Sequence, residues 1–167
     1  MTKSKVSSSQ FRRRSQSGVG LIEVLVAVLI LALGLLGMAG LQANALKTNQ
    51  SAYARSQAVM LSYYMLDAMR ADRTSATSQQ YNTGSAGGDG VIEPACSAGV
   101  FNQPTLVDNN RREWLVSLRE NLGDADTTCG AIFCGAGAAN ECIIQITWDD
   151  SRAGGLGQQR IETRSRL

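Results

Sequence analysis

The sequence contains no histidine among its 167 residues, only two prolines, and few aromatic side chains. Without histidine, a Ser-His-Asp triad and a histidine-ligated metal are both excluded. No side chain has an unperturbed pKa near neutrality. Hydrophobic residues still make up 44% of the chain, enough for a folded core, so the composition excludes a wholly disordered protein. The length fits one ordinary domain.

Acidic side chains are missing from residues 1–22, where five of the 16 basic side chains gather. These five are Lys3, Lys5, Arg12, Arg13 and Arg14. The other 11 basic side chains face 14 acids, so the rest of the chain carries −3. A basic N-terminus on a mildly acidic body does not indicate a nucleic-acid partner. It is typical of an N-terminus that stays on the cytoplasmic side of a membrane.

An uncharged apolar run begins at Val24 and ends at Leu41. As a helix it spans roughly 27 Å, close to the ~30 Å hydrocarbon thickness of a bilayer. The basic residues before it predict that everything from Gln42 onward is exported. Two alternatives are a secretory signal peptide cleaved at Ala43-Asn44-Ala45 and a plain signal anchor. The run is longer than a usual signal core, and neither alternative explains the glutamate at its start.

Glu23 stands directly before this run, where an ionised carboxylate inside a bilayer would cost on the order of 3 kcal/mol. If the chain is cut between Gly18 and Val19, Val19 carries a free α-amine, and Glu23 lies one helical turn after it. The carboxylate then lies beside an ammonium and at the positive end of the helix dipole. It can neutralise its own N-terminus or that of a neighbouring subunit. The alternative is a glutamate that snorkels at the interface.

Residues 17–25, SGVGLIEVL, resemble the class III signal of type IV pilins and type II secretion pseudopilins. The resemblance implies that a prepilin peptidase cuts after Gly18 and methylates Val19, and that Glu23 aids subunit docking. Two positions depart from the family pattern. Val19 stands where most pilins have phenylalanine, and Gly20 stands where a hydroxyl residue or similar is usual.

Residues 34–42, GLLGMAGLQ, are similar to minor pilins of the PilV type, the type IV pilus modification proteins. Residues 67–73 resemble the end of their long helix, and residues 148–150 resemble a Trp-acidic element near their C-terminus. The resemblance implies a minor pilin of the inner-membrane and tip complex that primes pilus growth. The implied partners are other minor pilins, the major pilin, prepilin peptidase, the inner-membrane assembly platform and a tip adhesin. A type II secretion pseudopilin remains the alternative.

Residues 42–73 lack proline and glycine and are rich in helix formers, so the sequence predicts one helix from about Gly20 to Arg73, roughly 80 Å long. Two apolar lines run along its exported half. Ala58, Leu61, Met65 and Met69 form the first, and Leu46, Tyr53 and Met60 form the second. The lines predict a helix that packs on its own domain with one side. The Met and aromatic residues are interpreted as core.

Beyond the helix, residues 74–90 are rich in Ser, Thr, Gly and Asn and predict a loop. A capping box at residues 110–113 and a stop at Gly123 predict a short amphipathic helix against a sheet, with Trp114, Leu115, Leu118 and Leu122 on one face. Residues 131–133, 142–148 and 159–167 predict strands. The last alternates charged and less polar residues, as expected of an edge strand guarded by charge.

The four cysteines, Cys96, Cys129, Cys134 and Cys142, all lie in the exported part. An even number of cysteines in an oxidising compartment predicts two disulfides, but the sequence leaves three pairings open. Zinc fits the spacing poorly, because no CxxC pair occurs. Calcium at Asp124, Asp126, Asp149 and Asp150 is a further alternative, although acidic loops are usually only solvated. We expect no metal, no cofactor and no enzyme activity, since no histidine can activate a serine.

The sequence therefore predicts an α+β fold in which a long N-terminal helix packs on a small antiparallel sheet. We expect a leader at residues 1–18, a transmembrane half-helix at residues 19–41, an exported half-helix at residues 42–73 and a disulfide-bonded head at residues 74–167. The expected location is the bacterial inner membrane, with a cytoplasmic N-terminus and a periplasmic head, and then the pilus tip.

Overall fold

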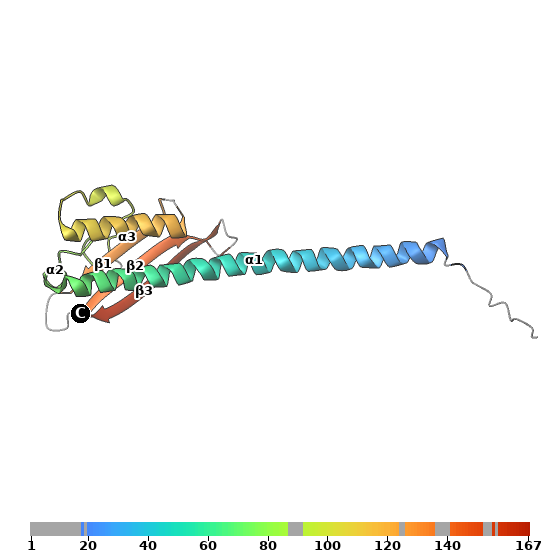
Figure 1. The fold of residues 1–167 in the computed structure, drawn as a ribbon, viewed down its shortest axis with the longest axis horizontal. Helices are drawn as coiled ribbons and strands as arrows, with labels where there is room; N and C mark the ends of the chain where they lie inside the picture. The colour runs from blue at the N-terminus through green and yellow to red at the C-terminus, as the bar shows by residue number, and fades with distance from the viewer. Residues whose placement is uncertain are drawn as a thin grey trace, which may run out of the picture. The chain divides into compact units, whose positions relative to one another are not determined.

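The computed structural model describes residue 18 and residues 20–86, 92–123, 126–135, 141–151, 155 and 157–167. Figure 1 shows the predicted α+β arrangement, a long helix followed by a small head with an antiparallel sheet. The elements are α1 (Leu21–Ala71), α2 (Arg73–Thr77), the 3-10 turn η1 (Ala98–Val100), α3 (Leu106–Leu122), β1 (Cys129–Cys134), β2 (Glu141–Asp149) and β3 (Gln158–Arg166). The chain divides into two compact units, residues 1–42 and 43–167, and the boundary falls within α1.

The end of α1 differs slightly from the prediction. The helix stops at Ala71, and residues 73–77, most of them predicted as loop, form α2 instead. Asp72 caps α2, because its side chain accepts a hydrogen bond from the backbone N–H of Ser75 at 3.4 Å. The hydroxyls of Thr77 and Ser78 donate to the carbonyls of Arg73 and Thr74. Serine and threonine were taken as loop formers. Here their hydroxyls hydrogen-bond to backbone carbonyls three or four residues earlier and so stabilise one more helical turn.

Three antiparallel strands form the sheet in the order β1-β2-β3, which confirms all three predicted strands. β3 lies at one edge, and its residues alternate as predicted. Arg160 and Arg164 are exposed on one face, whereas Ile161 and Thr163 face the protein. The Glu162 carboxylate accepts hydrogen bonds from Arg164 and from Gln145 of β2, and these two contacts hold its pKa below the usual range.

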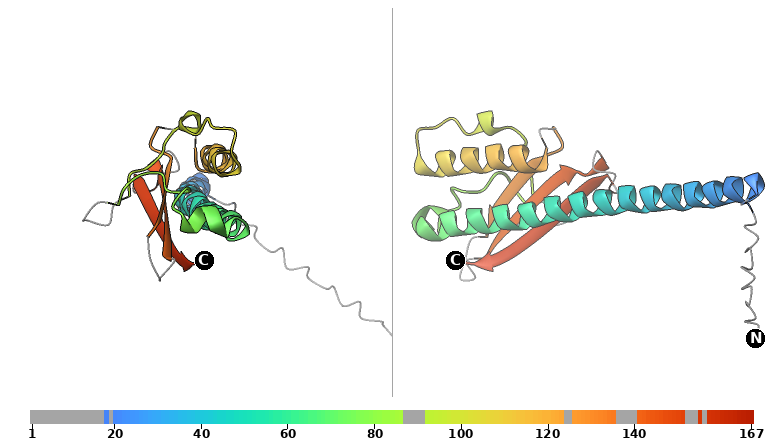
Figure 2. Two further views of the ribbon diagram at one scale, coloured as in Figure 1. Left: turned by 90° about the vertical axis from the view of Figure 1, so that its left-hand side faces the viewer. Right: turned by 45° about the vertical axis from the view of Figure 1, so that its right-hand side comes forward.

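One face of the sheet carries the core, and residues 43–71 of α1 lie with α3 on that side (Figure 2). The first apolar line of α1 is buried as predicted, with Met65 and Met69 fully covered. Trp114 of α3 is also fully buried, and its indole N–H donates to the Leu61 carbonyl at 3.0 Å. A Cβ on Gly130 of β1 would lie 2.4 Å from the Trp114 ring. The indole therefore joins both helices to the sheet, and only glycine leaves room for it.

α3 starts earlier than predicted. The expected capping box at residues 110–113 is wrong, because Thr105 is the N-cap and its hydroxyl accepts a hydrogen bond from the Asp108 N–H at 3.1 Å. Asn110 instead donates to the Tyr81 hydroxyl at 2.8 Å. The predicted end is confirmed: Gly123 has φ +115° and its N–H reaches the Arg119 carbonyl at 3.1 Å.

The outer edge of β1 is closed by a segment that is not itself a strand of the sheet. Three successive outward N–H groups of β1, on Gly130, Ile132 and Cys134, find acceptors there. The acceptors are the Ala95 carbonyl at 2.9 Å, the Thr83 hydroxyl at 3.0 Å and the Asn82 side-chain oxygen at 2.7 Å, in the same order. Two side chains and one backbone carbonyl thus replace a neighbouring strand.

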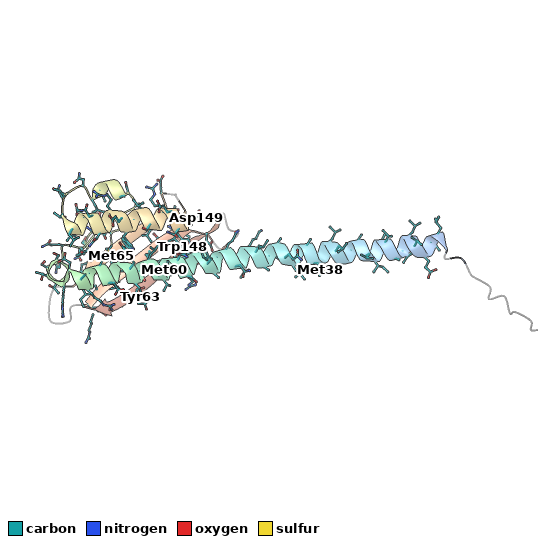
Figure 3. The ribbon with its side chains drawn as sticks, viewed as in Figure 1. Met38, Met60, Tyr63, Met65, Trp148 and Asp149 are labelled. Atoms are coloured by element: carbon teal, nitrogen blue, oxygen red, sulfur yellow. A yellow bond between two sulfur atoms is a disulfide. The ribbon has the colours of Figure 1, made fainter. Side chains whose placement is uncertain are left out.

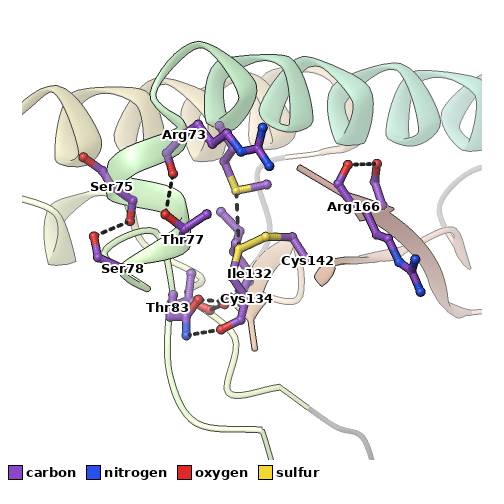
Figure 4. Close-up of a disulfide and its surroundings, with 12 residues drawn as sticks. Arg73, Ser75, Thr77, Ser78, Thr83, Ile132, Cys134, Cys142 and Arg166 are labelled. Carbon is purple, nitrogen blue, oxygen red and sulfur yellow. Dashed lines mark hydrogen bonds between the residues drawn. A yellow bond between two sulfur atoms is a disulfide. The ribbon is translucent and has the colours of Figure 1, made fainter. Parts of the chain in front are cut away.

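Two disulfides resolve the pairing that the sequence leaves open, Cys96–Cys129 and Cys134–Cys142. The first ties the segment beside β1 to the start of that strand. The second joins directly opposed positions of β1 and β2 (Figure 4). Its Cys134 sulfur lies 4.0 Å from the Met69 sulfur of α1. Each bridge contributes roughly 2–4 kcal/mol to a small domain.

A buried ion pair at the start of α3 predicts acid sensitivity. Burial raises the pKa of the Asp108 carboxyl, but hydrogen bonds from Arg111 and from the Gln103 N–H outweigh burial, so the pKa lies below its usual range. This contribution to stability is complete above the unfolded pKa of ~3.9 and is lost as pH falls through the lower folded value.

Asp108→Asn should lower the free energy of unfolding by about 1–3 kcal/mol near neutral pH, and the difference from wild type should shrink in acid. Urea unfolding over a pH series measures this, with the exposed Asp67→Asn as control. A difference that is independent of pH would contradict the prediction.

Candidate functional site

The candidate processing site lies immediately before α1. Gly18 is exposed, and Val19, the predicted site of cleavage and methylation, lies outside the described residues. Gly20 supplies the carbonyl that starts the helix, accepting from the Glu23 N–H at 2.9 Å. Glu23 is the only acidic residue in the first turn of α1, and it is exposed. This position favours a negative charge because of the helix dipole.

No described basic side chain lies within ion-pair distance of Glu23. Its carboxylate is one helical turn from position 19 in sequence, so an amine created there would be the nearest cation that processing can supply. The pairing of Glu23 with an amine at position 19 stays a prediction.

Residues 24–41 of α1 present an uncharged, largely apolar surface. In residues 21–41 every large apolar residue is exposed, from 49% at Val26 to 80% at Leu21. α1 is long and apolar enough to cross a membrane, and the most hydrophobic window has a mean hydropathy of 2.8 with none of it buried. Met38, labelled in Figure 3, is one of these exposed residues. Such a surface requires a bilayer or other apolar helices around it.

The second apolar line of α1 is exposed, which corrects the interpretation of all the Met and aromatic residues as core. Leu46, Tyr53 and Met60 are 63%, 62% and 56% exposed. Tyr63 and Tyr64 add further exposed rings, and Figure 3 shows Met60 and Tyr63 on the helix. Residues 43–71 therefore bury one side of the helix and leave apolar groups on another. Aromatic residues and Met are the types enriched at protein interfaces.

The acidic residues proposed for calcium are only partly described, because Asp124 lies outside the described residues. Asp149 and Asp150, at the end of β2, point to different environments. Asp150 is 3% exposed, whereas Asp149 is half-buried and accepts from the Ser151 N–H at 2.8 Å. In the described part of the chain no three Cys, Asp or Glu side chains gather as metal ligands.

The sequence analysis missed the polar cluster around Arg111 in α3. Its guanidinium pairs with Asp108, donates to the Asn82 carbonyl at 2.9 Å and lies 4.2 Å from the centre of the Phe101 ring. The Thr105-x-x-Asp108 spacing, a capping-box pattern, was the available signal. The cluster joins α3 to the segments before and after it, and we interpret it as structural.

Comparison with known proteins bears on the first unit only. Residues 13–39 match the family model described as a prokaryotic N-terminal methylation motif. No curated protein and no solved structure matches the chain. The motif supports a type IV pilin-like protein, either a pilin or a pseudopilin, and points to a structural protein that interacts with prepilin peptidase and with other pilins. Together with the apolar helix it is consistent with a membrane-anchored protein.

Proposed function

We propose that this chain is a minor pilin of the PilV type that takes part in the inner-membrane and tip complex priming type IV pilus assembly. The observation that carries the proposal is the methylation motif at residues 13–39 joined to a first-turn glutamate and a fully exposed apolar helix. The likeness of residues 34–42 to PilV-type proteins favours the pilus over a secretion pseudopilus.

In this proposal the precursor inserts with its basic residues 1–17 in the cytoplasm and residues 19–41 in the bilayer, while the disulfide-bonded head folds in the periplasm. Prepilin peptidase cuts after Gly18 and methylates Val19. The new ammonium and the Glu23 carboxylate then form a charged pair at the end of an apolar helix.

Two contributions drive assembly in this proposal: burial of the apolar helix surface and pairing of the Glu23 charge. Residues 21–41 pack against like helices of neighbouring subunits. Glu23 pairs with its own or a neighbour's ammonium, because an unpaired carboxylate among apolar helices is strongly unfavourable. The exposed line of Leu46, Tyr53 and Met60 supports further contacts on the periplasmic side of the same helix.

The mature N-terminus tests this proposal. We expect the protein purified from membranes of cells with prepilin peptidase to begin at Val19 and to carry one added methyl group. Intact-mass and N-terminal fragment analysis measure both. A protein that begins at Leu46 would be a secreted soluble protein, and one that keeps residues 1–18 would be a plain anchor, so either result overturns the proposal.

A gene deletion separates the pilus from secretion. Loss of twitching with normal exoprotein secretion supports the pilus. Lost secretion with normal pili would instead assign the chain to a type II secretion pseudopilus, which shares the motif.

A further inference from the structure

We infer that the Cys96–Cys129 disulfide is a redox-sensitive switch that closes one edge of the sheet. The intact bridge holds residues 92–96 against the start of β1. Reduction of this bridge alone releases residues 92–96, while the core of the head stays folded.

The two disulfides differ in how easily a reductant can reach them. Cys96 is partly exposed, and its partner Cys129 is 6% exposed. Cys134 and Cys142 are each 1% exposed and belong to the main hydrophobic core. A thiolate must approach a disulfide sulfur directly in order to reduce it, so access limits the rate. A dithiol therefore reduces the Cys96–Cys129 bridge first.

The reduction is a thiol–disulfide exchange with a dithiol. One thiolate of the dithiol attacks the Cys96 sulfur, and Cys129 leaves as a thiolate. The second thiol of the dithiol then displaces Cys96 and closes the dithiol's own disulfide. The bridge gains two electrons and two protons in this exchange, and the dithiol loses them.

Residues 92–96 lie beside the start of β1 as an additional extended segment. The backbone groups of Ala95 and Gly130 exchange two hydrogen bonds, at 2.8 Å and 2.9 Å. The disulfide joins the residues directly after Ala95 and directly before Gly130. Because Ala95 and Gly130 form an isolated bridge and not part of a longer ladder, the adjacent disulfide keeps the two segments together.

Residue 92 lies over the face of the sheet that points away from the helices. Gln145 of β2 is on this face, because its neighbours Ile144 and Ile146 point into the core and side chains alternate along a strand. The Ile92 N–H donates to the Gln145 side-chain oxygen at 3.4 Å, and both residues are buried. Release of residues 92–96 therefore uncovers Gln145 as well as the Gly130 edge.

The other end of β1 is closed by contacts that do not depend on this bridge. The Asn82 side-chain oxygen accepts a hydrogen bond from the Cys134 N–H at 2.7 Å. The Asn82 carbonyl accepts another from Arg111 of α3 at 2.9 Å, and the preceding Tyr81 is fully buried. These contacts remain after reduction. The switch thus frees the Gly130 end of β1 and leaves the Cys134 end closed.

Export sets the state of this switch, and only this biological setting rests on the proposed function. Thiols stay reduced in the bacterial cytoplasm, whereas the periplasm oxidises them to disulfides. A head that has not been oxidised therefore leaves backbone groups at the Gly130 end of β1 unpaired. Oxidation after export pairs them.

The order of reduction is tested on the full wild-type chain in non-ionic detergent micelles with graded dithiothreitol. Reduced cysteines are labelled with N-ethylmaleimide and identified by peptide mass analysis. We expect Cys96 and Cys129 to be labelled at least about tenfold faster than Cys134 and Cys142. Equal rates, or faster labelling of Cys134 and Cys142, would overturn the switch.

Local release is tested by amide hydrogen exchange, followed by nitrogen-15 NMR, in a chain that combines Cys96→Ser with Cys129→Ser. The Gly130 amide should exchange at least about tenfold faster than in wild type. The Cys134 amide, at the other end of the same strand, is the internal control and should be unchanged.

Unchanged exchange at Gly130 would overturn the inference. Equally faster exchange at Gly130 and Cys134 would also overturn it, because the bridge would then stabilise the whole head. If the double substitution misfolds, wild type at a dithiothreitol concentration that reduces only this bridge gives the same measurement. None of these results bears on the mature N-terminus, which tests the proposed function separately.

Discussion

Trp114→Ala should destabilise the head by about 3–5 kcal/mol, a large part of the stability of a domain of this size. The substitution empties the centre of the core, where the indole is fully buried between α1, α3 and β1. It also removes the donor to the Leu61 carbonyl. Urea unfolding of the full chain in micelles, followed by far-UV circular dichroism, measures the free energy of unfolding.

Two comparisons show whether the cause is the indole itself. Val116→Ala, on the exposed side of the same helix, should change stability by less than about 0.5 kcal/mol. Gly130→Ala should destabilise the wild-type chain, because its Cβ would overlap the Trp114 ring, but much less in the Trp114→Ala background. Additive effects of the two substitutions would contradict the close contact.

Glu23→Ala should leave cleavage after Gly18 largely intact and reduce incorporation into pili by at least about tenfold. The carboxylate does not support the head, since it lies in the first turn of α1 among exposed residues. Its effect is therefore expected only when the new ammonium needs a partner inside an assembly. The ratio of assembled to membrane-bound protein, determined by immunoblot of sheared pili and membranes, measures incorporation.

Glu23→Gln separates charge from shape, because it keeps the side-chain length and removes the negative charge. It should behave like Glu23→Ala. Glu113→Gln, on the exposed surface of α3, provides the charge-matched control and should be incorporated normally. Normal pilus numbers with Glu23→Gln would remove the ion pair from the mechanism.

The sequence predicted those parts of the fold that depend on periodic patterns. The helix from about residue 20, the three strands, the stop at Gly123 and the buried line through Met65 and Met69 all depend on local spacing, and the structure confirms them. The start of α3 was predicted wrongly because Asn110 and Thr105 offer competing caps. Thr105 has the capping-box spacing with Asp108 as well and is the N-cap, whereas Asn110 lies inside the helix and donates to the Tyr81 hydroxyl.

In the candidate site, too, features encoded in local spacing could be predicted and features that depend on distant segments could not. Gly18 and Glu23 were predicted from an apolar run and one charge at its start, and their roles in cleavage and docking stay predictions. The exposure of Leu46, Tyr53 and Met60 could not be predicted, because two apolar lines on a helix do not reveal which of them the remaining chain covers. The disulfide pairing and the buried carboxylate of Asp150 likewise depend on segments that meet only in the folded protein.

The closed outer edge of β1 limits how copies of this protein can misassemble. Within the described residues, Asn82, Thr83 and Ala95 occupy the hydrogen-bonding groups through which a foreign strand would add. Among the described strands, this leaves β3 as the edge at which sheets of two heads could join. A tag fused directly after Leu167 would lengthen this unpaired edge of the sheet. A label for imaging is therefore better placed in a surface turn than at the C-terminus.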